Sequence, residues 1–485
     1  MAINHDVDNE QSRMRAELWE PFIEKNKNKD EESHQERKSR RKESIAFVLL
    51  STLVAVFGSY EFGSCVGYST PVQTAIREDL ELSVAEFSLF GSLVTIGAMT
   101  GAVTSGHIAD LCGRKGAMRI SAILSSAGWV AIYFSKGALL LSAGRFLTGY
   151  GIGVLSFVVP IYIAEIAPKD LRGGLATLNQ LMIVLGASTT FILGTVVTWQ
   201  TLALTGILPC MVMLLGLVFI PESPRWLAKA GKGEEFEDTL RKLRGDDADI
   251  SHEVAEIQDY LKTLQLMPKV GTLDLFQRRY LHAVTIGVGL MFLQQFGGAN
   301  GIGFYASETF VLAGFTSGKL GIIAFACIQI PITTLGAILM DNCGRKPLLL
   351  VSAIGTFVGC FLAGTSFFMK NHGMLQQWPP LLVLAGVLTY IGSFSVGMGA
   401  IPWVIMSEVF PTNIKGKAGG LVNLVHWFSA WAVSYSYNFL MEWSPAGTFL
   451  LYSGFCAMAV LFVIKVVPET KGKTLEEIQA SLNSD

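Results

Sequence analysis

The sequence predicts an all-helical membrane protein with twelve transmembrane helices in two pseudo-symmetric halves of six, and three observations support this fold. The 485 residues are 51% hydrophobic and only 16% charged, which lies outside the range of ordinary soluble domains. The apolar residues form long continuous runs without the alternation of barrel strands, so the runs predict helices. Finally, several short motifs occur once in each half of the chain. A duplicated six-helix unit accounts for all three.

Each apolar run is close to the roughly 20 residues that a helix needs to cross the hydrocarbon core of a bilayer. In the N-terminal half, predicted at 46–220, the runs lie at 46–66, 87–107, 118–135, 138–158, 175–196 and 203–220. In the C-terminal half, predicted at 281–467, they lie at 282–304, 320–340, 347–368, 380–404, 418–440 and 447–466.

Three motifs of the first half return in the second half in the same order and at similar spacing. The pairs are Asp110-x-x-Gly113-Arg114-Lys115 with Asp341-x-x-Gly344-Arg345-Lys346, Pro160 to Pro168 with Pro402 to Pro411, and Pro221-Glu222-Ser223 with Pro468-Glu469-Thr470. Two homologous halves suit a carrier that works by alternating access, because rocking one half against the other opens a central site to either side. Transport is therefore the leading functional hypothesis.

Three polar segments flank and separate the halves. Residues 1–45 are too polar to form a core and predict a disordered N-terminal tail. Residues 221–280 have apolar side chains at helical spacing, which predicts two or three short amphipathic helices on the cytoplasmic surface. Residues 468–485 are expected to form a short C-terminal tail.

Basic residues favour one side of the predicted bundle. The loops after the even-numbered spans carry Arg114, Lys115, Lys169, Arg172, Arg345, Lys346, Lys415 and Lys417, whereas the opposite loops carry little beyond Arg77, Lys136, Lys319 and Lys370. This asymmetry predicts that both termini and the central loop are cytoplasmic. With a net charge of −2 and no single basic patch, we expect no nucleic-acid partner.

The chain has no pattern typical of an enzyme. No phosphate-binding loop, metal-spaced cluster or nucleophile and base pair appears in the spans, and the seven cysteines show no Cys-x-x-Cys spacing. We therefore expect no enzymatic activity, no catalytic or metal-binding residues, no cofactor, and transport without ATP.

Four motifs together resemble the sugar porter family of the major facilitator superfamily. They are Arg145-Phe146-x-x-Gly149-x-Gly151-x-Gly153, Pro221 to Trp226, Gln294-Gln295-x-Gly297 and Pro468 to Gly472. The resemblance covers about residues 45–475 and implies the major facilitator fold. The segment from Gly58 to Ser69 is similar to the early-response-to-dehydration-like branch of plant monosaccharide transporters.

Sugar recognition inside a membrane needs uncharged groups that donate and accept hydrogen bonds, together with an aromatic face. The resemblance implies a substrate site made of Gln180, Gln294, Gln295, Asn300, Gln329, Trp403 and Trp427. Gly297-Gly298 can bend the seventh span, and we expect Tyr305, beyond this bend, to act as an outer gate. The alternatives are hydrogen bonds between helices for the amides, and interface anchoring or packing for the tryptophans.

Glu165 and Glu408 lie near cytoplasmic helix ends, where the helix dipole disfavours an anion and a cationic partner is expected. One exposed ion pair contributes only about 0–1 kcal/mol, so a gate needs a network that forms in one conformation and breaks in the other. We expect a cytoplasmic gate made of Asp110, Arg114, Glu165, Arg172, Asp341, Arg345, Glu408 and Lys415. The alternative is that these charges only orient the loops.

Proton-coupled sugar porters carry an acid where this chain has Cys65, although the cognate Arg145 remains. A thiol in apolar surroundings stays neutral, so this departure favours facilitated diffusion. Glu61, one turn earlier on the same helix face, is the remaining acid, and with Arg145 it would couple protons in a symporter. Ser395 and His426 also depart from residues common in the family, which leaves the sugar open.

The expected function is thus a carrier for a monosaccharide such as glucose or fructose. A proton-coupled symporter and a non-transporting sugar sensor are the alternatives, although the short tails speak against a sensor. The expected partners are the sugar, the lipid bilayer and, in the symporter alternative, protons. We expect a monomer in the vacuolar membrane or the plasma membrane.

Overall fold

A computed structural model describes residues 44–168, 171–245, 248–266, 271, 273–374, 378–411, 414–471 and 477–478. The described segments contain helices and no strand. Residues 1–43 of the predicted N-terminal tail and most of the predicted C-terminal tail lie outside this range.

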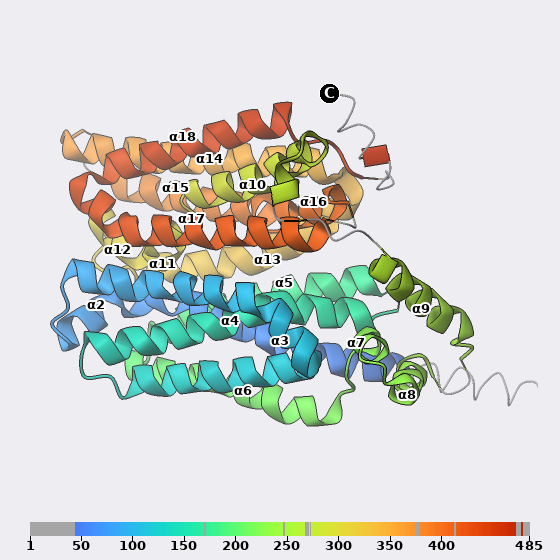
Figure 1. Cartoon of the computed structure of the whole chain (residues 1–485). Helices are drawn as coiled ribbons and strands as arrows, with labels where there is room; N and C mark the ends of the chain where they lie inside the picture. Colours follow the sequence, from blue (N-terminus) through green and yellow to red (C-terminus); the bar gives the residue numbers. More distant parts are fainter. Residues whose placement is uncertain are drawn as a thin grey trace, which may run out of the picture.

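The helices form two layers, one from each half of the chain. In Figure 1 the N-terminal half is the blue to green layer and the C-terminal half is the yellow to red layer. The N-terminal layer contains a first helix at Ser44–Gly67, then α2 (Ser69–Asp79), α3 (Val84–Tyr133), α4 (Ala138–Ile166), α5 (Arg172–Leu193) and α6 (Trp199–Phe219). The C-terminal layer contains α10 (Arg278–Phe296), α11 (Ala299–Phe304), α12 (Ala306–Ala313), α13 (Lys319–Cys343), α14 (Arg345–Asn371), α15 (Pro379–Ser393), η2 (Phe394–Met398), α16 (Ile401–Val409), α17 (Lys415–Trp443) and α18 (Pro445–Lys465).

Nine helices of the described chain are long and apolar enough to cross a membrane. The predicted runs all lie on helices, but the correspondence is not one to one. The helix α3 carries two runs, because the chain passes through Gly113 at a φ of 80° without a separate loop. The seventh run is divided between α10 and α11, and the tenth among α15, η2 and α16.

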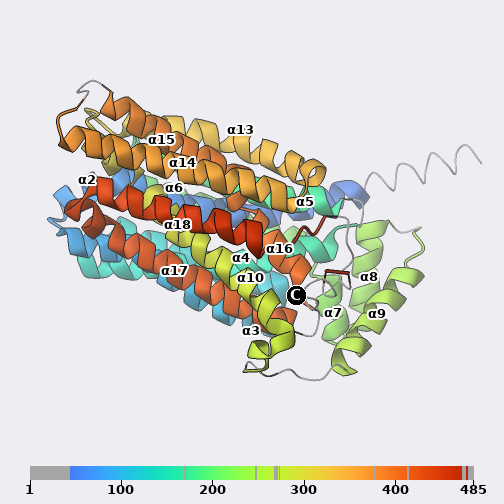
Figure 2. The ribbon, with the colours of Figure 1, turned by 90° about the horizontal axis from the view of Figure 1, so that it is seen from above.

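The polar segment between the halves forms α7 (Pro224–Lys229), α8 (Gly233–Arg244), α9 (Ser251–Leu266) and the short helix η1 (Leu273–Phe276). Leu227, Phe236, Leu240, Ile250 and Ile257 form a small core among them. Figure 2 shows α7, α8 and α9 at one end of the molecule and α2 at the other. We call these the α7 end and the α2 end.

Among the described residues, the two halves share a core only toward the α2 end. One apolar cluster there combines residues of both halves, such as Phe87, Phe191, Tyr305 and Phe325. The other two large clusters each draw on one half. The halves meet mainly where α3 packs on α17 and α5 packs on α13. Burial between the halves is therefore concentrated at the α2 end, which is closed.

Candidate functional site

Polar side chains from α10, α11 and α17 form one hydrogen-bond network. Nε2 of Gln295 donates to Oε1 of Gln294 at 3.1 Å and lies 3.3 Å from Nδ1 of His426. Oε1 of Gln295 accepts from Nδ2 of Asn300 at 2.7 Å. Gln294 in turn donates to the backbone carbonyl of Met398 at 2.5 Å. Because the two glutamines are buried, these bonds determine how their amides are oriented.

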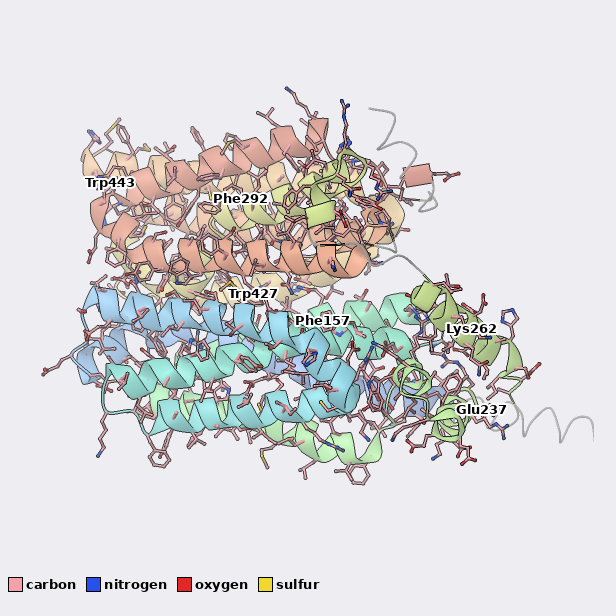
Figure 3. All side chains as sticks on the ribbon, in the orientation of Figure 1. Phe157, Glu237, Lys262, Phe292, Trp427 and Trp443 are labelled. Atoms are coloured by element: carbon pink, nitrogen blue, oxygen red, sulfur yellow. The ribbon has the colours of Figure 1, made fainter. Side chains whose placement is uncertain are left out.

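Aromatic rings enclose this network and reach the other half. The ring of His426 lies 4.9 Å from that of Trp403 and 5.1 Å from that of Trp427. Trp427 in turn lies 6.1 Å from Phe62 of the first helix, and Figure 3 shows it at the boundary between the layers. The indole of Trp427 therefore lies where the halves meet.

Several buried polar atoms near this boundary have no hydrogen-bond partner among the described residues. They include Nε1 of Trp427 and Oε1 of Gln329. Gln180 is half-buried on α5, which packs against the α13 helix that carries Gln329. Buried polar groups are normally paired, so an unpaired indole donor and an unpaired amide acceptor suit a ligand rich in hydroxyl groups.

The predicted substrate residues are thus partly brought together. Five of them belong to one connected cluster: Gln294, Gln295, Asn300, Trp403 and Trp427. Gln180 and Gln329 lie on the facing helices α5 and α13 and make no hydrogen bond to that cluster in the described structure. His426 joins the cluster and had been recognised in the sequence only as a departure from the family.

The seventh predicted span bends at Gly297-Gly298, where α10 ends. Gly298 has a φ of 97°, and a Cβ there would stand 2.6 Å from the ring of Tyr452. Beyond the bend, the buried ring of Tyr305 stacks on Tyr437 at 5.3 Å. Its hydroxyl lies against Gly91 of the other half, where a Cβ would stand 2.5 Å from it. Tyr305 therefore contacts both halves near the α2 end, as its predicted role in an outer gate requires.

At the α7 end, Arg114 forms a bidentate ion pair with Glu165. Its Nε and Nη2 atoms donate to the two carboxylate oxygens at 2.8 and 2.9 Å. Ser223 also donates to Glu165, at 2.5 Å. Asp110 is exposed and pairs with Lys229 at 2.9 Å. All these residues belong to the N-terminal half or to the segment that follows it.

The corresponding pair in the C-terminal half is weaker. Nη2 of Arg345 donates to Oε1 of Glu408 at 3.2 Å, while Oε2 of Glu408 and Nε of Arg345 are buried without a partner in the described structure. Lys415 donates instead to the carbonyl of Ser407 at 2.8 Å. The side chain of Asp341 lies outside the described residues.

Two of the predicted gate cations lie outside the ion pairs of this conformation. Arg172 is exposed and forms no ion pair with a described residue, while Arg114 binds both oxygens of Glu165. Lys415 binds a carbonyl and does not form an ion pair with Glu408. The ion pairs seen at the α7 end also join residues within one half, so none of them bridges the halves in this conformation.

Glu222 and Glu469 have a structural role that the sequence analysis did not assign. Glu222 accepts the backbone N–H groups of Arg114 and Lys115, and Glu469 accepts those of Arg345 and Lys346. Burial raises the pKa of the Glu222 carboxyl above its ordinary value. Burial also acts to raise the pKa of Glu469, but its backbone N–H donors outweigh this effect and lower it. The repeated Pro-Glu motif was the signal that could have identified both residues.

Glu61 and Arg145 are both buried, yet no ion pair joins them. Oε1 of Glu61 accepts from the indole of Trp129 at 2.6 Å, and its Oε2 has no described partner. Arg145 donates to the backbone carbonyl of Cys65 at 2.8 Å and to the hydroxyl of Ser69 at 2.6 Å. The guanidinium is thus held by neutral acceptors.

Comparison with known proteins agrees with this architecture. Residues 21–482 match the family described as "Sugar (and other) transporter". Sugar transporter ERD6-like 16 of Arabidopsis thaliana is 62% identical over 450 residues, which is 93% of each chain. Sugar transporter ERD6-like 7 of the same plant is 62% identical over 436 residues, covering 90% of this chain and 94% of its own.

Solved structures of the xylose transporter XylE from E. coli have the same fold. The inward-open form matches with a TM-score of 0.76 at 28% identity, over 90% of this chain and all of that one. The proton:xylose symporter XylE bound to 6-bromo-6-deoxy-D-glucose matches with a TM-score of 0.74 at 28% identity, over the same shares. XylE is a transporter of the major facilitator superfamily.

Proposed function

The chain belongs to the sugar transporter family, and from this premise we propose that it carries a monosaccharide, such as a hexose, by alternating access. Membership makes it an integral membrane sugar transporter of the major facilitator fold and not an enzyme. The observation that carries the finer proposal is the cluster around Gln295 and Trp427, which lies where the halves meet. Its amides and indoles match the hydroxyl groups and apolar face of a sugar ring.

In the proposed site, the unpaired atoms bind the sugar directly. Nε1 of Trp427 would donate to a sugar hydroxyl and Oε1 of Gln329 would accept from one. Gln180, on the facing half, would bind the sugar from the other side. The sugar would thus connect groups of both halves, which is what a ligand must do to bias their relative movement.

The α7 end is proposed to face the cytoplasm. Arg114, Arg172, Arg345 and Lys415 all lie at or near this end, and basic residues favour the cytoplasmic side. Both termini would then be cytoplasmic, and the closed α2 end would face outward. This conformation corresponds to the inward-facing stage of the cycle, in the plasma membrane or the vacuolar membrane.

Facilitated diffusion is the proposed mode of transport. A symporter needs an embedded group whose protonation changes during the cycle, and an acid paired with Arg145 would provide it. Here Arg145 is bound by the carbonyl of Cys65 and the hydroxyl of Ser69, which do not titrate in this range. Proton symport is the second candidate, since Glu61 is a buried carboxylate with one unpaired oxygen.

Flux of a labelled hexose panel into vesicles containing the purified protein tests the proposal. We expect saturable uptake that equilibrates without a proton gradient. Concentrative uptake that a protonophore abolishes would instead identify a symporter. Binding of a hexose without flux would identify a sensor and contradict carrier function.

A further inference from the structure

One face of α2 connects the two halves at the α2 end. Thr70, Gln73 and Arg77 lie on it, because their spacing of three and four residues repeats with the helical turn. Thr70 donates to the carbonyl of Gly303 at 2.5 Å, and Nε2 of Gln73 donates to Oε2 of Glu308. Nη1 of Arg77 lies 3.8 Å from Oε1 of Glu308. All three side chains thus bind the segment that follows the bend at Gly298.

Glu308 receives two of these three contacts. Its two carboxylate oxygens face two donors of the N-terminal half, while Glu308 itself belongs to the C-terminal half. The contacts exist only while the halves meet at the α2 end. They therefore stabilise the closed conformation relative to the open one, which is the differential interaction that shifts a conformational equilibrium.

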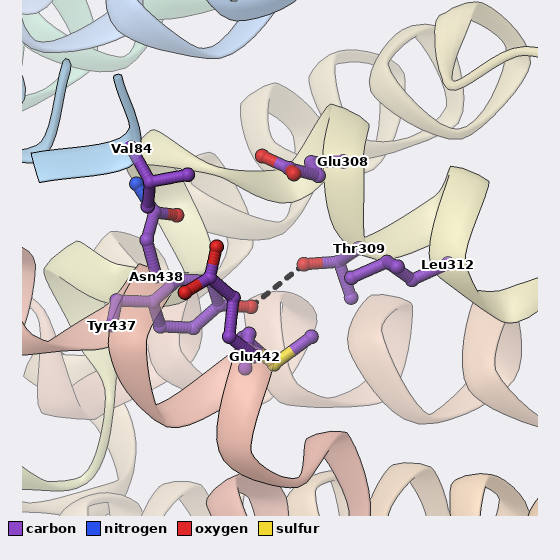
Figure 4. Close-up of a pocket in the computed structure, with 8 residues that line it drawn as sticks. Val84, Glu308, Thr309, Leu312, Tyr437, Asn438 and Glu442 are labelled. Atoms are coloured by element: carbon purple, nitrogen blue, oxygen red, sulfur yellow. Dashed lines mark hydrogen bonds between the residues drawn. The ribbon is translucent and has the colours of Figure 1, made fainter.

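Glu308 also borders a cavity of about 80 Å³ that contains a second carboxylate. Its lining includes Val84, Glu308, Thr309, Tyr437, Asn438 and Glu442. Figure 4 shows Glu308 on one side and Glu442 on the other, with Thr309 bonded to the hydroxyl of Tyr437 between the helices. Burial raises the pKa of the Glu308 carboxyl above its ordinary value, and repulsion from Glu442 acts in the same direction.

Among the described cations, Arg77 forms the ion pair with Glu308. Besides burial, the charges of Arg77 and Glu442 act on the Glu308 carboxyl. Elsewhere on α2, Asp79 accepts from the indole of Trp199 and Glu78 is exposed. Further groups on the surrounding helices are Lys319 at the start of α13, Lys370 of α14, which donates to the carbonyl of Leu312, and the uncharged Tyr437 and Tyr390.

We propose that Thr70, Gln73 and Arg77 form a latch, which holds the α2 end closed by binding the segment that contains Gly303 and Glu308. Protonation of Glu308 from the α2 side opens this latch. The ionised carboxylate pairs with Arg77 and accepts from Gln73, so it holds the halves together. Protonation removes the ion pair and one acceptor, so the α2 end opens more readily. These are positioning residues, since they act through the conformational cycle and not on the sugar. The inference rests on the proposed function for the direction of the α2 end.

A cysteine placed at the seam between the halves measures latch opening directly. Ser88 is buried there and accepts from the amide of Asn438 across the seam. In a carrier with Ser88→Cys and with the exposed cysteines replaced by serine, a membrane-impermeant maleimide is applied from the α2 side. Labelling is compared at about pH 5 and about pH 7.5, which span the range where partly buried carboxylates titrate. Rates are normalised to the same reporter carrying Glu308→Gln, since the reactivity of the thiol itself changes with pH.

We expect Glu308→Gln to label about fivefold faster than the parent at the higher pH and about equally at the lower pH. Gln73→Ala and Arg77→Ala should also label faster at the higher pH. Glu442→Gln should lower the pH at which labelling accelerates, because Glu308 is no longer repelled by a second carboxylate. Glu78→Gln is the matched control on α2 and should follow the parent at both values.

The proposal would be overturned if the ratio of labelling rates between the parent and Glu308→Gln did not change with pH. It would also be overturned if Glu78→Gln raised the labelling rate at the higher pH as Glu308→Gln does. Labelling is independent of flux, so the latch and the proposed function fail separately. If the protein moves no hexose but shows the Glu308 effect on labelling, the latch is supported and the proposed transport function is contradicted. Normal hexose flux without the Glu308 effect supports the transport function and contradicts the latch.

Discussion

The carboxylate of Glu222 lies directly against Gly113, where a Cβ would stand 2.4 Å from Oε2. Glu469 has the same relation to Gly344, at 2.9 Å. Both glycines have a positive φ, of 80° and 92°, and each is followed by an Arg-Lys pair whose N–H groups bind the acid. The two halves thus repeat one turn that depends on a glycine and on a distant carboxylate.

The first prediction concerns these glycines. Gly113→Ala and Gly344→Ala should each destabilise the folded protein by about 1–2 kcal/mol, because a side chain is strained at positive φ and would meet the carboxylate. Thermal unfolding in detergent measures the effect. Gly173→Ala is the control, since nothing lies within 4 Å of a Cβ there. Equal stability of all three variants would contradict the proposed strain.

The second prediction compares the two arginines at the α7 end. Arg114→Ala should cost about 1.5–3 kcal/mol, because it removes two charge-assisted bonds to a largely buried Glu165. Arg345→Ala should cost about half as much, since only one bond of 3.2 Å is lost. Arg172→Ala should be neutral. If thermal unfolding showed a larger loss of stability for Arg345→Ala than for Arg114→Ala, the Arg345–Glu408 pair would contribute more than the Arg114–Glu165 pair, which would contradict the prediction.

The third prediction separates binding from folding in the substrate site. Gln329→Ala should raise the half-saturation concentration for hexose by about 2- to 10-fold, which corresponds to a hydrogen bond of about 0.5–1.5 kcal/mol. It should leave the unfolding temperature nearly unchanged, since Oε1 has no partner among the described residues. Asn342→Ala, an exposed amide on the same helix, is the control. Unchanged half-saturation would remove Gln329 from the site.

The fourth prediction tests the absence of an acid beside Arg145. Cys65→Asp should place a carboxylate near the guanidinium and make uptake depend on the proton gradient. Glu61→Gln should keep equilibrative flux, because Glu61 is bonded to Trp129 and forms no pair with Arg145. Uptake by the native carrier should be insensitive to a protonophore. Sensitivity that disappears in Glu61→Gln would instead assign proton coupling to Glu61.

The fifth prediction concerns the pH dependence of stability. The pKa of Glu469 is lower in the folded protein than in the unfolded chain. Its contribution to the free energy of unfolding is therefore present above the unfolded-state pKa of about 4.3 and is lost as the pH falls through the folded-state pKa. The pKa of Glu222 is instead raised in the folded protein. Its contribution to the free energy of unfolding is therefore present below a pH of about 4.3 and is lost as the pH rises through the folded-state pKa.

Unfolding temperatures measured across this pH range distinguish the two acids. Glu469→Gln should flatten the loss of stability on the acid side, whereas Glu222→Gln should remove a loss that develops as the pH rises. A change of the same sign in both variants would show that burial affects the two carboxylates alike.

The sequence by itself was sufficient to predict the apolar spans, the duplication into halves and the family. Hydrophobic run length is a local property, so each span could be recognised without its neighbours. Motifs such as Gln294-Gln295 and the paired Asp-x-x-Gly-Arg-Lys are also continuous in the chain. The bend at Gly297-Gly298 followed from the backbone freedom of glycine alone.

Only the tertiary structure decided which side chains meet. Glu61 accepts a hydrogen bond from Trp129 of α3 and forms no ion pair with Arg145 of α4. The pairing of Glu308 with Gln73 depends on which end of the bundle is closed. Such contacts join residues separated by tens to hundreds of positions, and their geometry follows from how the helices cross. Residue spacing within one helix determines which face a side chain occupies, but the packing of the whole bundle determines what that face touches.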